Sequence, residues 1–253
     1  MISNYTRREV VAGISVASCL LSNTACAAPK TDAKKHWTMT QGIPDRHVRP
    51  ATRWLLDNFG PVLTAKLAGT QVSLALACAI ACQESAYTWF DRPEFKTGRA
   101  PEEMMRLLVL DNVSPRRAFP RDTAAFKNDA RFRDLAPGLI AIADASRMAR
   151  GYSTTGNLLY GYGLFQYDLQ NIQTDPTFWR DTVPGASSPG LWGDVSACIS
   201  RFIAEMNRKI AHHPNDERAA VAAYNGSGPN ARAYAEIVLK FRNLADREIR
   251  GAA

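Results

Sequence analysis

The sequence has almost no stretches in which apolar and polar residues alternate, and it has no internal repeats or low-complexity segments. Because alternation with a period of two is typical of half-buried strands, its scarcity argues against a mainly β fold. The chain also lacks a lysine- or arginine-rich block and any nucleic-acid-binding signature, so we expect no nucleic-acid partner. Its net charge of +7 is spread along 253 residues, which suits either a solvated basic surface or an anionic partner.

Long hydrophobic runs are missing as well. Residues 10–21 form an apolar run that is too short to cross a bilayer as a helix. The run follows Arg7 and Arg8 and precedes the small residues 25–28, an order typical of a signal peptide, here of twin-arginine type. We therefore expect residues 1–27 to be an export signal, with lipidation at Cys26 as a minor alternative, and residues 28–48 to be a flexible lead-in. This predicts a periplasmic or secreted protein whose mature form has no transmembrane span.

Cysteine is scarce once the export signal is set aside. Cys78, Cys82 and Cys198 remain, and the first two lie four residues apart on one face of a helix. Either one of them pairs with Cys198 in an oxidising compartment, or all three are buried thiols. The spacing of the cysteines and histidines does not suggest a metal site, and nothing in the sequence implies a cofactor.

Helical periodicity is what the sequence has in place of strands. Segment 71–84 is apolar nearly all round, which predicts a core helix, and segment 195–210 is amphipathic. The fold class predicted is mainly α, with helices near residues 49–59, 71–84, 101–110, 134–150, 195–210, 219–224 and 231–245.

The core helix ends in Glu84, which is followed by Ser85. A carboxyl group at the edge of an apolar helix is partly removed from water, and this favours its protonated form. A protonated carboxyl group can donate a proton to a leaving oxygen, as glycoside cleavage requires. The same pattern is also expected of a surface glutamate that happens to end a buried helix.

A glycine-rich segment, residues 160–168, is the second signal. Gly163 permits a tight turn or a close approach to a ligand, and Gln166 offers both a donor and an acceptor for sugar hydroxyl and N-acetyl groups. Tyr167 and its aromatic neighbours supply apolar surface, and Asp168 supplies a second carboxylate. A hairpin with aromatic side chains in the core would have the same composition.

The third signal is Tyr224 and Asn225, followed by Gly226. Asn225 can bind a substrate amide, and the hydroxyl of Tyr224 can bind a carboxylate. An ordinary helix C-terminus, with Asn and Gly in the cap, explains the same residues.

Taken in order, the three segments resemble the superfamily of soluble lytic transglycosylases and goose-type lysozymes. The family pattern is Glu-Ser at the end of an apolar helix, then Gly-Leu-Met-Gln, then Ala-Tyr-Asn-x-Gly. This chain has Glu84-Ser85, Gly163-Leu164-Phe165-Gln166 and Ala223-Tyr224-Asn225-Gly226, and it departs from the third pattern because a glycine follows Asn225 directly.

The resemblance implies a lysozyme-like helical domain over residues 49–253, with a groove for peptidoglycan glycan strands. It implies that Glu84 is the general acid and later the base of a lytic transglycosylase that forms 1,6-anhydro-N-acetylmuramic acid. Gly163, Gln166, Tyr167, Tyr224 and Asn225 would line the groove, and Ser85 would join the local hydrogen bonding.

One departure is large, because Glu84 and Gly163 are 79 positions apart, further than in the family. Residues 92–155 are therefore expected to be a helical insertion that walls the groove or binds a cell-wall or secretion-machinery partner. Two other functions stay open. One is a lysozyme-type hydrolase that uses Glu84 and Asp168. The other is a non-catalytic peptidoglycan-binding or secretion-associated protein on the same fold. The sequence also leaves open whether such an enzyme is a housekeeping enzyme or an antibacterial toxin.

Overall fold

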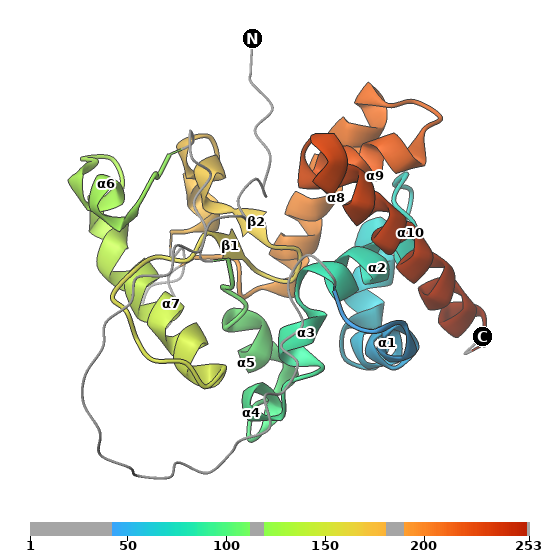
Figure 1. Ribbon diagram of the computed structural model, residues 1–253, viewed down its shortest axis with the longest axis horizontal. Helices are drawn as coiled ribbons and strands as arrows, with labels where there is room; N and C mark the ends of the chain where they lie inside the picture. Colours follow the sequence, from blue (N-terminus) through green and yellow to red (C-terminus); the bar gives the residue numbers. More distant parts are fainter. Residues whose placement is uncertain (1–41, 112–118, 181–189, 252–253) are drawn as a thin grey trace, which may run out of the picture.

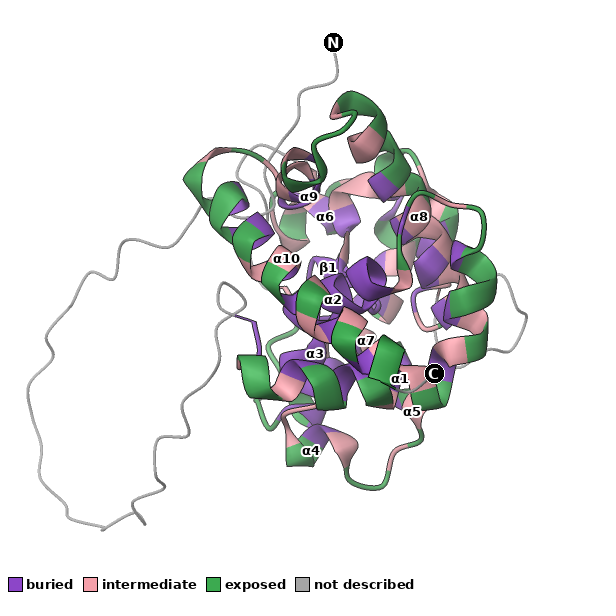
Figure 2. Cartoon of the chain, turned by 90° about the vertical axis from the view of Figure 1, so that its right-hand side faces the viewer, coloured by how far each residue is buried: buried purple, intermediate pink, exposed green. Residues whose placement is uncertain are grey.

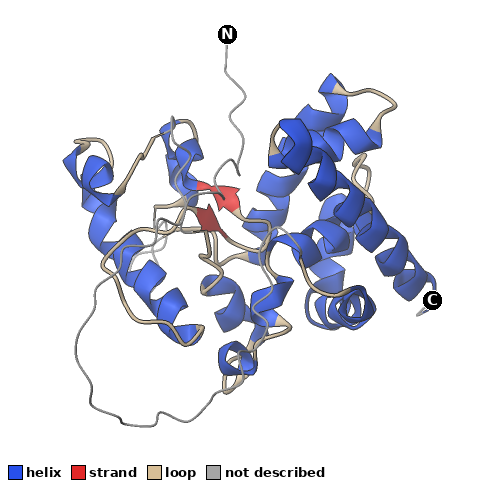
Figure 3. Cartoon of the chain, in the orientation of Figure 1, coloured by secondary structure: helices blue, strands red, loops and turns tan. Residues whose placement is uncertain are grey.

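The computed structural model describes residues 42–111, 119–180 and 190–251. The expected export signal and most of the lead-in lie outside these residues. The described chain is mainly helical, which confirms the predicted fold class (Figures 1 and 3). Its α-helices are α1 (Asp45–Leu67), α2 (Leu74–Glu84), α3 (Ala86–Trp89), α4 (Pro93–Lys96), α5 (Pro101–Arg106), α6 (Thr123–Asn128), α7 (Ala136–Ala149), α8 (Val195–His212), α9 (Glu217–Asn225) and α10 (Gly228–Gly251).

Helix α2 forms the centre of the core. Every residue from Ala75 to Glu84 is buried, as expected for a helix that is apolar on all sides. Ser73 begins the helix by accepting a 3.1 Å hydrogen bond from the backbone N–H of Leu76. Helices α1 and α10 pack against α2, and buried residues gather inside the assembly while exposed residues follow its outward faces (Figure 2).

The first and last described helices are joined by a pair of arginines. Arg49 and Arg53 of α1 donate hydrogen bonds of 2.9 and 2.7 Å to the carboxylate of Glu248 in α10. The hydrogen bond from Arg53, followed by that from Arg49, outweighs the effect of burial and holds the pKa of Glu248 below its usual value. These contacts fix α10 against α1, on one side of α2.

A small sheet carries the glycine-rich segment. Strand β1 (Gly161–Tyr162) pairs with the antiparallel strand β2 (Tyr167–Asp168). The segment after α5 extends this sheet, because the N–H of Leu110 donates to the carbonyl oxygen of Gly161 at 3.0 Å and the N–H of Gly163 donates to that of Leu108 at 2.7 Å. The helix predicted over residues 101–110 is therefore too long: it ends at Arg106, because the next residues pair with the hairpin.

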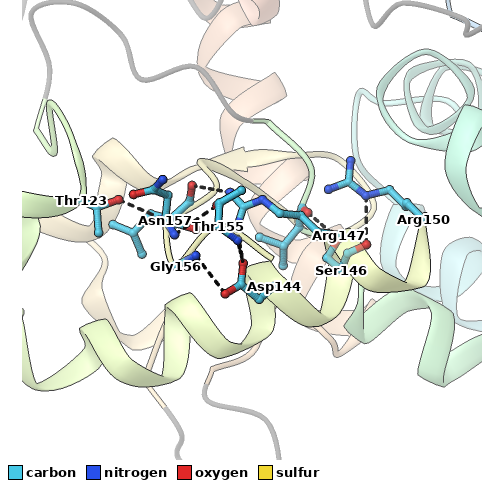
Figure 4. A network of polar contacts seen from close by, with 10 residues as sticks. Thr123, Asp144, Ser146, Arg147, Arg150, Thr155, Gly156 and Asn157 are labelled. Carbon is cyan, nitrogen blue, oxygen red and sulfur yellow. Dashed lines mark hydrogen bonds and ion pairs between the residues drawn. The ribbon is translucent and has the colours of Figure 1, made fainter. Parts of the chain in front are cut away.

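Helices α4 to α7 lie within residues 92–155, the segment that the resemblance predicts to be an insertion, and α6 and α7 lie on the far side of the small sheet from α8 to α10 (Figure 1). A polar network fastens α7 to the following loop (Figure 4). Asp144 accepts hydrogen bonds from Arg147 at 2.7 Å and from the backbone N–H groups of Thr155 and Gly156 at 3.0 and 3.1 Å. The loop leads directly into β1, so the network helps to position the glycine-rich segment.

Candidate functional site

Ser85 joins the end of α2 to the glycine-rich turn. Its hydroxyl group donates a 2.7 Å hydrogen bond to the carbonyl oxygen of Leu164 and accepts a 3.0 Å bond from Nε1 of Trp89. Ser85 is fully buried. The residue therefore positions the segment next to Glu84, and its hydroxyl group is not available to a substrate.

Tyr224 joins the third motif to the same turn. Its hydroxyl group donates a 2.8 Å hydrogen bond to the carbonyl oxygen of Phe165, and its ring stacks on Tyr234 with a centroid separation of 6.5 Å. The structure thus brings together the three segments that the sequence singled out. The hydroxyl groups of Ser85 and Tyr224 thus both donate to backbone carbonyl oxygens of this turn.

Glu84 is the last residue of α2, and only 1% of its surface is exposed. The hydroxyl group of Tyr234, on α10, donates a 2.7 Å hydrogen bond to its Oε1 atom. A carboxyl group that is removed from water and held by a neutral donor can exchange a proton with a bound ligand at a fixed position. Sequence reasoning missed Tyr234, because the helical spacing of Ala231, Tyr234 and Ala235 predicts only that this face is buried.

The glycine-rich turn needs its unusual residues for its own shape. Gly163 has a φ of 76°, and a Cβ atom there would clash with Sγ of Cys198. Gln166 has a φ of 52°, and its Nε2 atom donates a 2.8 Å hydrogen bond to the carbonyl oxygen of Gly163. Both residues therefore shape the turn against which Ser85 and Tyr224 are bound.

Asn225 has a different environment. It is 3% exposed, and its Oδ1 atom has no hydrogen-bond partner among the described residues. A buried acceptor that lacks a donor costs about 1–3 kcal/mol, and a donor from a ligand, such as an amide N–H, would remove that cost. Asn225 is therefore a predicted site residue with an acceptor that a ligand donor would satisfy.

Asp168 and Tyr167 lie on β2. Asp168 is 4% exposed, and its Oδ1 atom caps a 3-10 helix, Leu169–Gln173, by accepting a 2.8 Å hydrogen bond from the N–H of Gln170. Tyr167 stacks on Trp179 with a centroid separation of 5.5 Å. Burial, followed by the carboxylate of Glu205, raises the pKa of Tyr167 to about 12. The helix cap formed by Asp168 gives that carboxylate a structural role, independent of any ligand.

A small hollow adjoins Tyr167 and Tyr224. Its volume is about 200 Å³, including space open to solvent, and its lining is aromatic apart from one carboxylate and one thiol: Tyr162, Phe165, Tyr167, Phe178, Cys198, Phe202, Glu205 and Tyr224. Glu84 does not line it. The hollow is therefore not the groove that the resemblance implies.

The three cysteines of the described chain are free and buried, so of the two alternatives the structure has the buried thiols. Sγ of Cys198 donates a 2.9 Å hydrogen bond to the carbonyl oxygen of Trp192. Within the described ranges, no group of three or more His, Cys, Asp or Glu residues is placed to hold a metal ion. None of the described helices is both long enough and apolar enough to cross a membrane.

Comparison with known proteins returned no match: no family model, curated protein or solved structure resembles this chain at a significant level. The resemblance to lytic transglycosylases rests on the three motifs alone.

Proposed function

We propose that this chain cleaves the β-1,4 glycosidic bond between N-acetylmuramic acid and N-acetylglucosamine in peptidoglycan, as a lytic transglycosylase. One observation carries the proposal. The carboxyl group of Glu84 is buried and bonded to Tyr234, and it lies next to Ser85, which binds the glycine-rich turn to which Tyr224 is also bound. A site for proton transfer needs a carboxyl group that is both dry and fixed in position.

In the proposed reaction, Glu84 acts first as an acid and then as a base. Its proton passes to the glycosidic oxygen as the bond from that oxygen to C1 of the muramic acid breaks. The resulting carboxylate then accepts the proton of the 6-hydroxyl group of the same sugar, while the 6-oxygen bonds to C1. The atoms balance without water, and Glu84 ends in its protonated form. Tyr234 holds the carboxyl group in place and stabilises it when it is charged.

The other motif residues divide into two groups in this proposal. Asn225 offers its Oδ1 atom to the N–H of an N-acetyl group. Ser85, Gly163, Gln166 and Tyr224 act indirectly, because their polar groups or backbone shapes hold the turn and the helix end together. Export to the cell wall is part of the same proposal and rests on the sequence of residues 1–27.

A lysozyme-type hydrolase would need a second group to activate water, and Asp168 is the residue that the sequence offers. In the structure, one oxygen of Asp168 is engaged as a helix cap. We therefore favour the mechanism that uses one carboxyl group. If Asp168→Asn abolished cleavage while the protein stayed folded, hydrolysis would become the better proposal.

The deciding experiment is mass spectrometry of muropeptides released from purified peptidoglycan. The comparison is between the unmodified protein, Glu84→Gln, and Glu205→Gln as a matched control in a half-buried glutamate. We expect Glu84-dependent products that are lighter by one water and have no reducible end. Products with a free reducing end would indicate a lysozyme. Absence of Glu84-dependent release would contradict the proposal and leave a peptidoglycan-binding protein.

A further inference from the structure

Arg150, which follows α7, is a buried cation without a counter-ion. Only 8% of its surface is exposed. Its Nε atom donates a 3.1 Å hydrogen bond to the carbonyl oxygen of Ser146, and within the described ranges no carboxylate forms an ion pair with its guanidinium group. Figure 4 shows its two terminal nitrogens pointing away from α7. Because a buried charge is costly unless it is paired, this arrangement needs an explanation.

Arg147, one turn earlier, is the internal comparison. It is also 8% exposed, yet both terminal nitrogens of its guanidinium group have acceptors. It donates to Oδ1 of Asp144 at 2.7 Å and to the carbonyl oxygens of Asn157 and Leu158 at 2.7 and 3.2 Å. Arg147 therefore has acceptors for both terminal nitrogens, from α7 and from the loop that follows it, whereas Arg150 bonds to Ser146 through its Nε atom.

A second arginine lies beside Arg150. Arg92 donates a 3.1 Å hydrogen bond to the backbone carbonyl oxygen of Arg150 and a 2.8 Å bond to the hydroxyl group of Tyr152. The guanidinium carbons of Arg92 and Arg150 lie 5.2 and 5.4 Å from the centre of the Tyr152 ring. The positive charge of Arg92 acts against that of Arg150, and an anion bound at Arg150 would offset this repulsion and supply the missing counter-ion.

Electrostatics agrees with this geometry. Burial is the largest influence on Arg150 and lowers its pKa, and the charges of Arg92 and Arg147 lower it further, while Tyr87 and Tyr152 act in the opposite direction. Tyr87 lies on α3, three residues after Glu84, so the arginine pair is close to the segment that carries the candidate acid. Tyr152 is 45% exposed, which puts the pair at an open edge of the molecule.

We propose that Arg150 and Arg92 bind a carboxylate of the peptidoglycan substrate, contributed by the peptide attached to muramic acid. This inference rests on the proposed function, because that function supplies the class of ligand. The terminal nitrogens of Arg150 form the planar fork that binds a carboxylate through two parallel hydrogen bonds. The site would select glycan that carries peptide over bare glycan. Residues 92–155, which contain both arginines, would then contribute to substrate specificity.

The test measures binding to the full chain in the Glu84→Gln background, so that no bond is cleaved. The probes are muramyl dipeptide with a free peptide carboxylate, the same compound with that carboxylate amidated, and N-acetylmuramic acid, whose only carboxylate is its lactyl group. We expect the acid form of the dipeptide to bind about tenfold more tightly than the amide. Arg150→Gln and Arg92→Gln should each remove this preference. Arg133→Gln, an exposed arginine of the same insertion, should retain it.

The outcomes separate the two proposals. Equal affinity for acid and amide, no binding of either, or a preference that survives in both arginine variants would overturn the carboxylate site. If N-acetylmuramic acid bound tightly and this binding depended on Arg150, the group recognised would be the lactyl carboxylate, and the assignment to the peptide carboxylate would be wrong. Since Arg150 is buried, melting curves check that its variant folds, and the half-buried Arg92 provides the second variant. If the chain showed no Glu84-dependent cleavage but still preferred the carboxylate form of the dipeptide, the proposed enzymatic activity would be rejected and the carboxylate site would be supported.

Discussion

The hydroxyl group of Tyr234 donates a 2.7 Å hydrogen bond to Oε1 of Glu84 across 150 positions of sequence. Both residues are almost fully buried, at 3% and 1% exposure. The bond connects α10 to the end of α2, the two helices of the core that pack together most extensively. The position of the candidate acid therefore depends on the C-terminal helix as well as on its own.

Replacing Tyr234 with phenylalanine tests this dependence. Glu84 would lose the donor that orients it and stabilises its charged form, and hydrogen bonds to charged groups contribute about 1.5–3 kcal/mol. We therefore expect kcat for peptidoglycan cleavage to fall about 10- to 100-fold, with KM nearly unchanged. Steady-state kinetics on soluble glycan fragments would measure both values.

The matched control is Tyr162→Phe. Tyr162 is equally buried, and its hydroxyl group has no hydrogen-bond partner in the described part of the chain. Removal of that hydroxyl group should leave kcat unchanged. If Tyr234→Phe behaved like the control, the hydrogen bond to Glu84 would have no part in catalysis.

Asn225 should separate activity from stability. Its Oδ1 atom is buried without a partner among the described residues, so within those ranges Asn225→Ala breaks no hydrogen bond to that atom. We expect the free energy of unfolding to change by less than about 1 kcal/mol, and KM to rise about tenfold because a substrate contact is lost. Thermal melts and substrate-dependent rates measure the two effects. A large loss of stability with normal KM would assign Asn225 to the scaffold.

The sequence predicts helices well where one face determines them. The amphipathic pattern of residues 195–210 corresponds to α8, Val195–His212, and the all-apolar segment 71–84 contains α2. It fails after α5, where residues 107–110 continue a helical pattern but pair with the hairpin instead. That pairing joins segments about fifty positions apart, so it cannot be predicted from the local periodicity of either segment.

Some residues of the candidate site can be predicted from a local sequence pattern, and others cannot. Glu84 could be singled out because an acid at the end of an apolar helix is a local pattern. Tyr234 could not, because its polar role arises only when α10 crosses α2. Asp168 attracted attention as a second carboxylate, whereas its cap on the N–H of Gln170 is a local signal that could also have been noticed in the sequence.

Asp144 gives a pH-dependent prediction. Burial, the largest single influence, raises its pKa, but the N–H groups of Thr155 and Gly156 together with Arg147 hold the pKa below its usual value. A depressed pKa stabilises the fold above the ordinary aspartate range and ceases to do so as pH falls through the folded value. We expect Asp144→Asn to lower the free energy of unfolding by about 1–3 kcal/mol at neutral pH, with the difference shrinking below about pH 4.

Denaturant melts from pH 7 down to pH 3 check this dependence. Asp134→Asn is the control, since its ion pair with Arg180 is exposed and should contribute less than about 1 kcal/mol at any pH. A difference between Asp144→Asn and the unmodified protein that did not vary with pH would show that shape, and not charge, gives Asp144 its effect.

The buried thiols allow a chemical test of the core. Burial raises the pKa of Cys78 and of Cys198 to about 12 and also raises that of Cys82. The thiolate is the reactive form, so little of it exists at pH 8. In a chain with Cys19 and Cys26 replaced by serine, we expect almost no reaction with an aromatic disulfide reagent until the protein is denatured, and then three equivalents. A count of one after denaturation without reductant would reveal a disulfide. Rapid labelling of the folded protein would mean that α2 or α8 unfolds locally with ease. The inference that a rigid core fixes the position of Glu84 would then be wrong.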